Sequence, residues 1–428
     1  MKSKSYKYPF KDLLLVYLLI AYSTIPIFRN NFGLGLLITC IIYLHKDVLK
    51  SLRIEALIVL SVVFLLELYH VSYFPNYDIG IFRQVITSFI VAISVAYHLK
   101  INFLGIYIKI MYITTIISFF FFFGLLISPE LMHIIADSMP AIFKVSSEYS
   151  QYYGEDLVRV NPIIYNFDHN FYAIRNNGPF WEPTVFASLL LIGQIFNYTL
   201  NRKFLNKVGI IFTIGIVTTF STTVFISYLI FLLGILLFNS RMNKFSKGIL
   251  FVCTIVSSLY IYYELPFLEE KINSQIAEVD NNIELSGDSR MAGATLDLFE
   301  VSQNNIHLFF GKGSDRDSRI GGIDKAVQRN CGLTGLLVEW GMFFFVIYIA
   351  LIYYSFYQLS RIHGLNSLFA VPFTLCILIV SFSEIFFDLP LFHTFIFFGL
   401  VIKRYYKPKH QQPTQAVEPV KSIHAAFV

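Results

Sequence analysis

Runs of apolar residues long enough to cross a lipid bilayer recur along this 428-residue chain. A membrane-spanning helix needs about 20 such residues, with a range of about 17–25. Hydrophobic residues make up 56% of the chain and charged residues 14%, against about 25% charged residues in an ordinary soluble domain. This composition excludes a disordered chain, a fibre and a conventional soluble enzyme, and it indicates a polytopic membrane protein.

The apolar runs predict an all-α fold with about twelve transmembrane helices. The expected spans are 12–28, 32–45, 54–73, 83–99, 103–127, 183–200, 205–220, 222–239, 248–264, 333–356, 366–384 and 387–402. The seventh and eighth spans meet at Ser221, so they form either a tight hairpin or one bent element.

The lysine and arginine positions predict the orientation, because cytoplasmic loops of membrane proteins are enriched in basic residues. With a cytoplasmic N-terminus, every short cytoplasmic connection is basic. These residues are Lys46, Lys50, Arg53, Lys100, Arg202, Lys203, Lys207, Arg241, Lys244, Lys247, Arg361, Lys403, Arg404, Lys407 and Lys409. An even number of spans then places both termini in the cytoplasm. The net charge of +5 therefore bears on orientation rather than on nucleic-acid binding.

Two long polar segments, 128–182 and 265–332, are expected outside the membrane. Loops well beyond about 12–15 residues are uncommon unless they are functional or disordered. Residues 1–402 are thus expected to form the transmembrane domain, and residues 403–428 a disordered cytoplasmic tail. The short helices expected on the membrane surface in these loops are 130–136 and 291–299.

The cysteines indicate neither a disulfide framework nor a zinc site, because no Cys-x-x-Cys or Cys/His cluster is present. Asp315 and Asp317 have the Asp-x-Asp spacing with which some nucleotide-sugar enzymes hold a metal. Nucleotide sugars are absent outside the membrane, so no metal site and no cofactor are expected.

Ionisable residues inside apolar runs are candidates for function by default. They are Glu67, His70, Glu339, Glu384, Asp388 and His393. Most lie near the ends of expected spans, where hydration makes them less costly, whereas a proton-coupled transporter needs such groups deeper in the membrane. Gly311 and Gly313 predict a flexible loop, without the Lys-Ser/Thr of a phosphate-binding loop.

Segment 175–187 contains a cation, two amides, an aromatic ring and a carboxylate directly before an expected span. It reads Arg-Asn-Asn-Gly-Pro-Phe-Trp-Glu-Pro-Thr-Val-Phe-Ala. Gly178 with the following proline predicts a turn, and Pro183 suits the first turn of a helix, which places Glu182 at the N-cap. The structural alternative is that Trp181 anchors the chain at the interface and that Glu182 complements the helix dipole.

The outer loops are rich in cations that suit phosphate recognition. They are Arg159, Arg175, Arg290, Lys312, Arg316, Arg319 and Arg329. Guanidinium groups match phosphate oxygens in bidentate geometry. The outer face of a bilayer offers one phosphate-rich substrate class, the polyprenyl-diphosphate-linked sugars. The alternative is that these cations are solvated, or paired with acids such as Asp156, Asp288, Asp297 or Asp317.

These features together resemble the O-antigen and exopolysaccharide polymerase (Wzy-type) branch of the polymerase/ligase superfamily. The residues of the first motif are Arg175, Gly178, Phe180, Glu182, Pro183, Phe186 and Ala187. Segments 289–298, 308–313 and 332–341 are similar to the superfamily's arginine-bearing outer helix, its Gly-x-Gly ending and the following span. Ligases usually have His-Asn where this chain has Arg329-Asn330, and Asn-Pro-Asn in place of 182–184, which favours a polymerase.

The resemblance implies transfer of a growing glycan from undecaprenyl diphosphate to the non-reducing end of a lipid-linked repeat unit. Arg175 and Arg290 would stabilise the diphosphate leaving group, and Glu182 would accept the proton of the acceptor hydroxyl. The residues expected to bind substrate are Arg159, His169, Tyr172, Asn176, Asn177, Trp181, His307, Lys312, Arg316, Arg319 and Arg329. Among them, His169 and His307 are further candidates for the base, and Tyr172 and Trp181 are expected to stack on sugar rings.

The expected partners are undecaprenyl-diphosphate-linked oligosaccharide repeat units, membrane lipids, a chain-length regulator and a flippase, and no nucleic acid. The expected location is the bacterial cytoplasmic (inner) membrane. Three alternatives stay open: a ligase of the same superfamily, a flippase or secondary transporter, and a membrane scaffold. The absence of an internal repeat disfavours an inverted-repeat transporter.

Overall fold

A computed structural model describes most of the apolar part of the chain as helix. The described residues are 8–29, 32–43, 54–75, 77–146, 158–167, 175–203, 206–239, 290–315 and 331–405, with a few single positions between 245 and 255. Every expected span coincides with a helix except 248–264, which lies largely outside the described residues. Within the described ranges, 5 helices are long and apolar enough to cross a membrane, so the count of twelve crossings stays a prediction.

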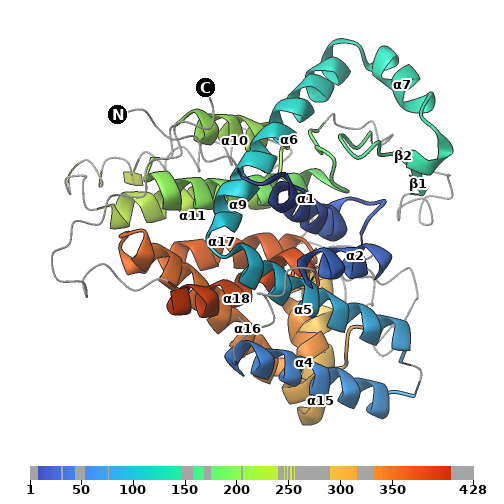
Figure 1. Cartoon of the computed structure of the whole chain (residues 1–428), viewed down its shortest axis with the longest axis vertical. Coiled ribbons are helices and arrows are strands. Elements are labelled where there is room, and N and C mark those ends of the chain that lie inside the picture. The colour runs from blue at the N-terminus through green and yellow to red at the C-terminus, as the bar shows by residue number, and fades with distance from the viewer. Residues whose placement is uncertain are drawn as a thin grey trace. The chain divides into compact units, whose positions relative to one another are not determined.

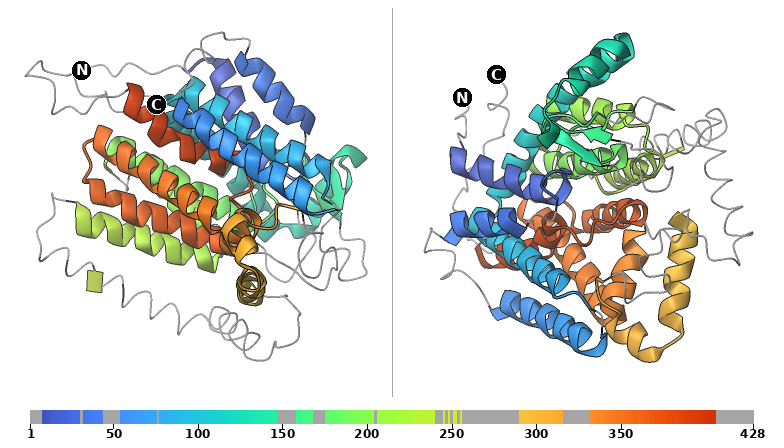
Figure 2. Two further views of the ribbon diagram at one scale, coloured as in Figure 1. Left: turned by 90° about the horizontal axis from the view of Figure 1, so that it is seen from below. Right: turned by 90° about the vertical axis from the view of Figure 1, so that its right-hand side faces the viewer.

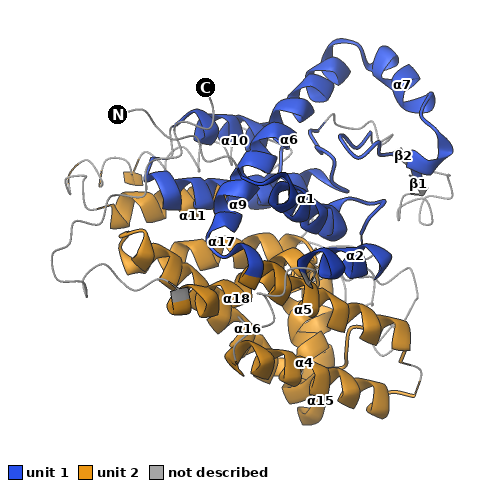
Figure 3. Ribbon diagram, in the orientation of Figure 1, with its two compact units in different colours: residues 1–45, 98–225, 407–428 blue, residues 46–97, 226–406 orange. Residues whose placement is uncertain are grey.

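The chain forms two compact units, shown in separate colours in Figure 3. Unit 1 contains residues 1–45, 98–225 and 407–428, and unit 2 contains residues 46–97 and 226–406. Both units are therefore built from segments that are far apart in the sequence. Two of the four boundaries fall inside helices, one in α5 (Ile79–Leu99) and one in α11 (Thr222–Phe238).

Unit 1 is a helical bundle with one small hairpin, labelled in Figure 1. Its elements are α1 (Phe10–Thr24), α2 (Phe32–Tyr43), α6 (Asn102–Ile127), α7 (Pro129–Asp137), η1 (Ala141–Phe143), β1 (Lys144–Ser146), β2 (Val158–Val160), α9 (Pro183–Asn201) and α10 (Lys207–Thr218). Helix α9 contacts both α6 and α10. Its most apolar 18-residue window is 89% buried, which makes α9 an interior helix of the unit.

Close packing around α9 depends on small residues and on one buried hydroxyl. A Cβ atom at Gly193 would lie 2.8 Å from the Phe212 ring of α10, so only glycine permits this approach. On the other side, the Tyr107 hydroxyl of α6 donates to the Leu189 carbonyl at 2.9 Å. Because lipid cannot satisfy polar groups, this hydroxyl needs such a partner inside the protein.

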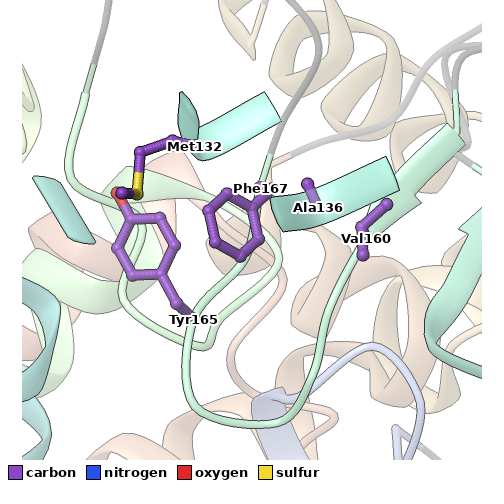
Figure 4. Close-up of a cluster of buried hydrophobic side chains, with 5 residues drawn as sticks. All are labelled: Met132, Ala136, Val160, Tyr165 and Phe167. Carbon is purple, nitrogen blue, oxygen red and sulfur yellow. The ribbon is translucent and has the colours of Figure 1, made fainter. Parts of the chain in front are cut away.

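The described part of segment 128–182 contains an antiparallel pair of short strands, β1 and β2. Val145 lies opposite Arg159 in this ladder, and a further bridge joins Val160 to Phe167. Figure 4 shows the apolar cluster that packs α7 onto this hairpin. The cluster consists of Met132, Ala136, Val160, Tyr165 and Phe167. The loop therefore has its own small core, and the predicted short helix 130–136 is confirmed by α7.

Unit 2 is built around one long helix, α16 (Gly332–Ile362), which contacts helices from most of the unit. The other elements are α4 (Ile54–Tyr73), most of α5 and of α11, α14 (Arg290–Ser302), α15 (Asn305–Phe310), η3 (Ser367–Phe369), α17 (Ala370–Ser383) and α18 (Pro390–Tyr405). Helices α17 and α18 lie alongside α16 (Figure 2). Because α18 continues to Tyr405, the expected tail boundary at 402 is three residues too early.

Apolar side chains on several helices face outward, as expected for a protein surrounded by lipid. In α4 only 28% of the most apolar window is buried, and Phe64, Leu65 and Leu68 are exposed. Helix α6 has the same low share, with Phe120 exposed. Soluble proteins rarely expose such large contiguous apolar faces to water. These two helices therefore indicate that the protein is embedded in a membrane.

Candidate functional site

The candidate residues fall into two groups, one in each unit. Arg175, Asn176, Asn177, Trp181 and Glu182 belong to unit 1. Arg290, His307 and Lys312 belong to unit 2. The convergence of Arg175 and Arg290 on one diphosphate therefore stays a prediction. Arg159 lies in β2, and the expected residues that lie outside the described part of the chain are His169, Tyr172, Arg316, Arg319 and Arg329.

In unit 1, the Arg175 guanidinium closes the turn at the C-terminal end of α10. Its Nε donates to the Thr219 carbonyl at 2.8 Å, and its Nη2 donates to the Phe220 carbonyl at 3.2 Å. A cation at this end of a helix is favoured by the helix dipole. Arg175 thus has a structural role, and its half-buried position leaves part of the side chain accessible.

The first of the two asparagines after Arg175 holds the segment against the helices of unit 1. Asn176 is completely buried, and its Nδ2 donates to the hydroxyls of Ser118 and Thr218, both at 3.1 Å. Its Oδ1 accepts the backbone N–H of Gly178. Asn177 is also buried. This geometry supports a structural role for the Asn176 side chain, which differs from the substrate-binding role expected from the sequence.

The residues that follow β2 also hold this segment. The Asn161 side chain donates to the Pro179 carbonyl at 2.8 Å, and the Asn166 N–H donates to the Gly178 carbonyl at 2.6 Å. Residues 175–182 are therefore fixed between the helices and the hairpin. Such fixing is what a site needs when it must present side chains in one geometry.

At the end of this segment, a cation, an indole ring and a carboxylate meet the start of α9. The Cζ of Arg29 lies 4.2 Å from the centre of the Trp181 ring, a cation–π contact. Glu182 is the N-cap residue of α9, and Pro183 follows in the first turn, as predicted. No side-chain cap bond of Glu182 is formed among the described residues. Arg29 lies 152 positions before Trp181, so the sequence pattern did not predict it as part of this site.

In unit 2, Arg290 forms an ion pair that the sequence did not predict. Its Nη2 lies 3.1 Å from Oε1 of Glu384, and the two side chains are 22% and 9% exposed. The alternative partners considered from the sequence were nearby acids, whereas Glu384 caps the C-terminal end of α17. The pair therefore fastens α14 to α17.

Lys312 is paired in a similar way with Glu300 of α14, and both side chains are buried. A third acid of α14, Asp297, accepts the Thr334 hydroxyl at 2.7 Å. Arg290, Asp297 and Glu300 recur at helical spacing, so this periodicity marks the face of α14 that contacts α16.

Segment 309–313 docks into a break in α16. Gly341 has φ 71 and ψ 171 within the helix, which interrupts its hydrogen bonds. The Lys312 and Gly313 N–H groups donate to the carbonyls of Val338 and Glu339, at 2.8 and 2.9 Å. A Cβ atom at Gly311 would lie 2.2 Å from the Glu339 oxygen. The expectation of a flexible Gly-x-Gly loop is therefore wrong, because these glycines permit a fixed close approach.

His307 lies beside this docked segment, within ring contact of Tyr73 and Phe74. Burial and the nearby Lys312 charge lower the pKa of His307, and Glu300 opposes this shift. A neutral imidazole at neutral pH can accept a proton, as a general base must. His307 thus has the electrostatic property expected of a base.

The described part of unit 2 buries more acids than cations. The buried carboxylates are Glu67, Asp297, Glu300, Asp315, Glu339 and Glu384. No group of three or more His, Cys, Asp and Glu side chains that could hold a metal occurs within the described ranges. The cations Arg290 and Lys312 are neutralised by their carboxylate partners, so anion binding by either one requires its ion pair to open.

These elements define a helical, membrane-embedded protein in which two polar segments are fixed against apolar helices. Comparisons with family models, with curated proteins and with solved structures found no match to the chain. The assignment of a particular function therefore depends on the chemistry of the residues and on the resemblance of the motifs.

Proposed function

We propose that the chain is a Wzy-type glycan polymerase of the bacterial cytoplasmic membrane. It transfers a growing glycan from undecaprenyl diphosphate to a lipid-linked repeat unit on the extracytoplasmic face. The single observation that supports it most is the fixed arrangement of Arg29, Trp181 and Glu182 at the start of α9. It joins a carboxylate, an indole ring and a cation in a segment that resembles the polymerase motif.

In the proposed reaction, the acceptor hydroxyl oxygen forms a bond to the anomeric carbon of the donor glycan. The bond between that carbon and the diphosphate oxygen breaks, and its electron pair leaves with the diphosphate. Glu182 accepts the hydroxyl proton, and Arg175 stabilises the negative charge that develops on the leaving group. The Trp181 ring offers an apolar face to a sugar, and Arg29 holds the ring in place.

Two residues of unit 2 are proposed for the same substrate. Arg290 is proposed to contact the diphosphate when its ion pair with Glu384 opens. His307 is the second candidate for the base, supported by its lowered pKa. Arg290→Ala and His307→Gln, assayed for chain extension, test the two roles separately.

Extension of purified lipid-linked repeat units by the reconstituted protein tests the proposal. We expect Arg175→Ala to slow extension by about 100-fold or more, and Arg175→Lys to retain part of the activity. We expect Glu182→Gln to slow extension by about 100-fold to 10,000-fold. Thermal unfolding of each variant separates loss of chemistry from loss of the bonds to Thr219 and Phe220.

Two matched controls accompany these variants. Arg361→Ala removes an exposed arginine in the last turn of α16, and Glu130→Gln removes an exposed first-turn carboxylate of α7. Both are expected to extend glycans at the wild-type rate. Normal chain lengths with folded Arg175→Ala and Glu182→Gln proteins would exclude these two roles. Transfer to a different acceptor in place of the repeat unit would identify a ligase.

A transporter of lipid-linked sugars is the second candidate function, favoured by the discontinuous α16. Broken helices with buried polar groups form the substrate and ion sites of many transporters. Here Gly341 interrupts α16 and the neighbouring Glu339 is buried. Movement of lipid-linked repeats across proteoliposomes without chain extension would support this second function.

A further inference from the structure

Helix α14 turns apolar side chains outward and charged side chains inward, the reverse of a helix on a water-exposed surface. Its exposed apolar residues are Met291, Leu298 and Phe299, and the last two are 50% and 54% exposed. The acids Asp297 and Glu300 of the same helix are buried. In water, an amphipathic helix directs its apolar stripe toward the core and its charges toward the solvent. The outward side of α14 therefore suits apolar surroundings.

Helix α15 contacts α14 and also presents apolar side chains outward. Ile306, Phe309 and Phe310 are 47%, 52% and 46% exposed. The stretch 301–311, which contains α15, has no Asp, Glu, Lys or Arg. The outward apolar face of the two helices consists of Met291, Leu298, Phe299, Ile306, Phe309 and Phe310. Soluble proteins rarely leave such a set of side chains in water, so this face needs an apolar cover.

The backbone at the two ends of α15 is hydrogen-bonded inside the protein. At the first end, the Asn304 side chain accepts the Ile306 N–H at 2.9 Å. At the other end, the Gly311 N–H donates to the His307 carbonyl at 2.9 Å. Lipid offers no partner for such groups, so a helix that contacts lipid needs these bonds. Helix α15 meets this condition at both ends.

The end of α15 lies beside α4 and within its length (Figure 1). The Phe310 carbonyl accepts a hydrogen bond from His70 Nε2 at 2.9 Å, and His70 precedes the last residue of α4, Tyr73, by three positions. The 20 residues of α4 extend about 30 Å, which equals the thickness of the hydrocarbon core. The end of α15 is therefore at the depth of the bilayer that α4 crosses.

The lipid-facing side of α4 leads directly to the outward apolar face. Leu65 and Leu68 are exposed on α4, and Tyr69 follows at helical spacing on the same side. The Tyr69 ring lies 5.9 Å from the Phe310 ring and 5.3 Å from the ring of Tyr73. Tyrosines are enriched where the hydrocarbon meets the headgroups, so this pair marks that level. The apolar surface of α4 and that of α15 thus meet near the membrane interface.

We infer that α14 and α15 are embedded in the outer leaflet of the membrane, with their outward apolar face against lipid acyl chains. A helix that lies on the membrane surface, as expected for 291–299, would turn its charges toward water. In α14 the charged side faces the protein instead, where Arg290 pairs with Glu384 and Glu300 pairs with Lys312. Part of the segment expected outside the membrane would therefore enter it. This inference goes beyond the proposed polymerase activity and does not depend on it.

The accessibility of a nitroxide spin label tests the inference in the full-length protein, reconstituted into phospholipid vesicles. The label is attached to Phe299→Cys or to Phe309→Cys, with Cys40 and Cys253 replaced by serine. The same protein without an added cysteine gives the background. Oxygen enters hydrocarbon, whereas a polar nickel chelate is excluded from it. We expect the ratio of oxygen to nickel collision rates to be about tenfold or more above that of a label in water.

Two exposed positions of the same unit calibrate this ratio. Leu65→Cys, on the lipid-facing side of α4, gives the value for hydrocarbon. Arg361→Cys, in the last turn of α16, gives the value for water. Labels at Phe299 and Phe309 should match Leu65 rather than Arg361. Thermal unfolding of each labelled protein shows that it is folded, and all four positions are exposed, so the label displaces no buried side chain.

A ratio as low as that of Arg361 at Phe299 or Phe309 would overturn the inference, because the face would then lie in water. Low collision rates with both reagents would also overturn it, because the face would then be covered by protein, such as a second copy of the chain. The measurement needs no glycan substrate. A label in lipid on a protein that does not extend glycans would support this inference and exclude the polymerase.

Discussion

Gly311 lies so close to the backbone of residues 339–341, and Gly341 to the backbone of residues 309–310, that neither position can hold a side chain. A Cβ at Gly341 would lie 2.3 Å from the Phe309 oxygen, and both glycines have positive φ. We expect Gly311→Ala to lower the free energy of unfolding by about 2–4 kcal/mol, from overpacking plus backbone strain. Thermal or denaturant unfolding in detergent micelles measures the change.

Gly335 of α16 provides the control for this substitution. No heavy atom lies within 4 Å of the position its Cβ would occupy. We expect Gly335→Ala to be neutral, or to stabilise by up to about 1 kcal/mol through helix propensity. Equal stability of the two alanine variants would show that the close approach of segment 309–313 to α16 is not maintained in solution.

His307 should make the stability of the protein depend on pH. Its pKa is lowered in the folded state, so the unfolded chain binds more protons as the pH falls through the ordinary histidine value of about 6.5. Stability is therefore complete above that value and is lost as the pH falls below it. We expect His307→Gln to flatten the decrease in melting temperature between about pH 7 and about pH 5. An unchanged pH profile would contradict the assignment.

At the scale of single elements, α14 is held in unit 2 by polar contacts as well as by apolar packing. The ion pair between Arg290 and Glu384 joins α14 to the end of α17. We expect a double-mutant cycle with Arg290→Ala and Glu384→Ala to give a coupling free energy of about 1–3 kcal/mol, because the pair is largely buried.

The control for this cycle pairs two exposed residues that belong to different units, Arg361→Ala and Glu130→Ala. Their effects should add to within about 0.5 kcal/mol, as expected for independent sites. A coupling between Arg290 and Glu384 as small as that of the control would show that the ion pair does not stabilise the position of α14.

The helices were predictable because their signal is local. Segment 54–73 reads as one uninterrupted apolar run and forms α4 over the same residues. Segment 333–356 also reads as uninterrupted, yet α16 breaks at Gly341. The break is stabilised by the N–H groups of Lys312 and Gly313, which donate to carbonyls of α16. Because these donors come from a different segment of the chain, the sequence of the apolar run alone does not predict the break.

The candidate site was predictable only in part, for the same physical reason. Glu182 at the N-cap of α9 followed from Pro183, which is a neighbour in the sequence. The partner of Arg290 is 94 positions away, at Glu384. The heptad-like spacing of Arg290 and Asp297 on α14 could have revealed a buried polar face, but not the identity of its partners.

At the scale of the whole molecule, the number of membrane crossings determines where the two ends of the chain lie. An even number places both termini on the same side of the membrane, and the basic short loops predict that this side is the cytoplasm. We expect a fluorescent reporter that folds only in the cytoplasm to be active at either terminus. Inserted after residue 150, in the first long outer loop, the same reporter should be inactive. Opposite results at the two termini would require an odd number of crossings.

Because the ribosome makes the chain from its N-terminus, the segment around Arg175 cannot reach its folded conformation until residues further along the chain have been made. Its guanidinium is satisfied by carbonyl groups 44 and 45 positions downstream, and the Asn176 amide needs Thr218 as well as Ser118. During synthesis, α10 must therefore leave the translocon before the segment around Arg175 can form these hydrogen bonds. A protein truncated before Thr218 would display the motif residues without the backbone that orients them.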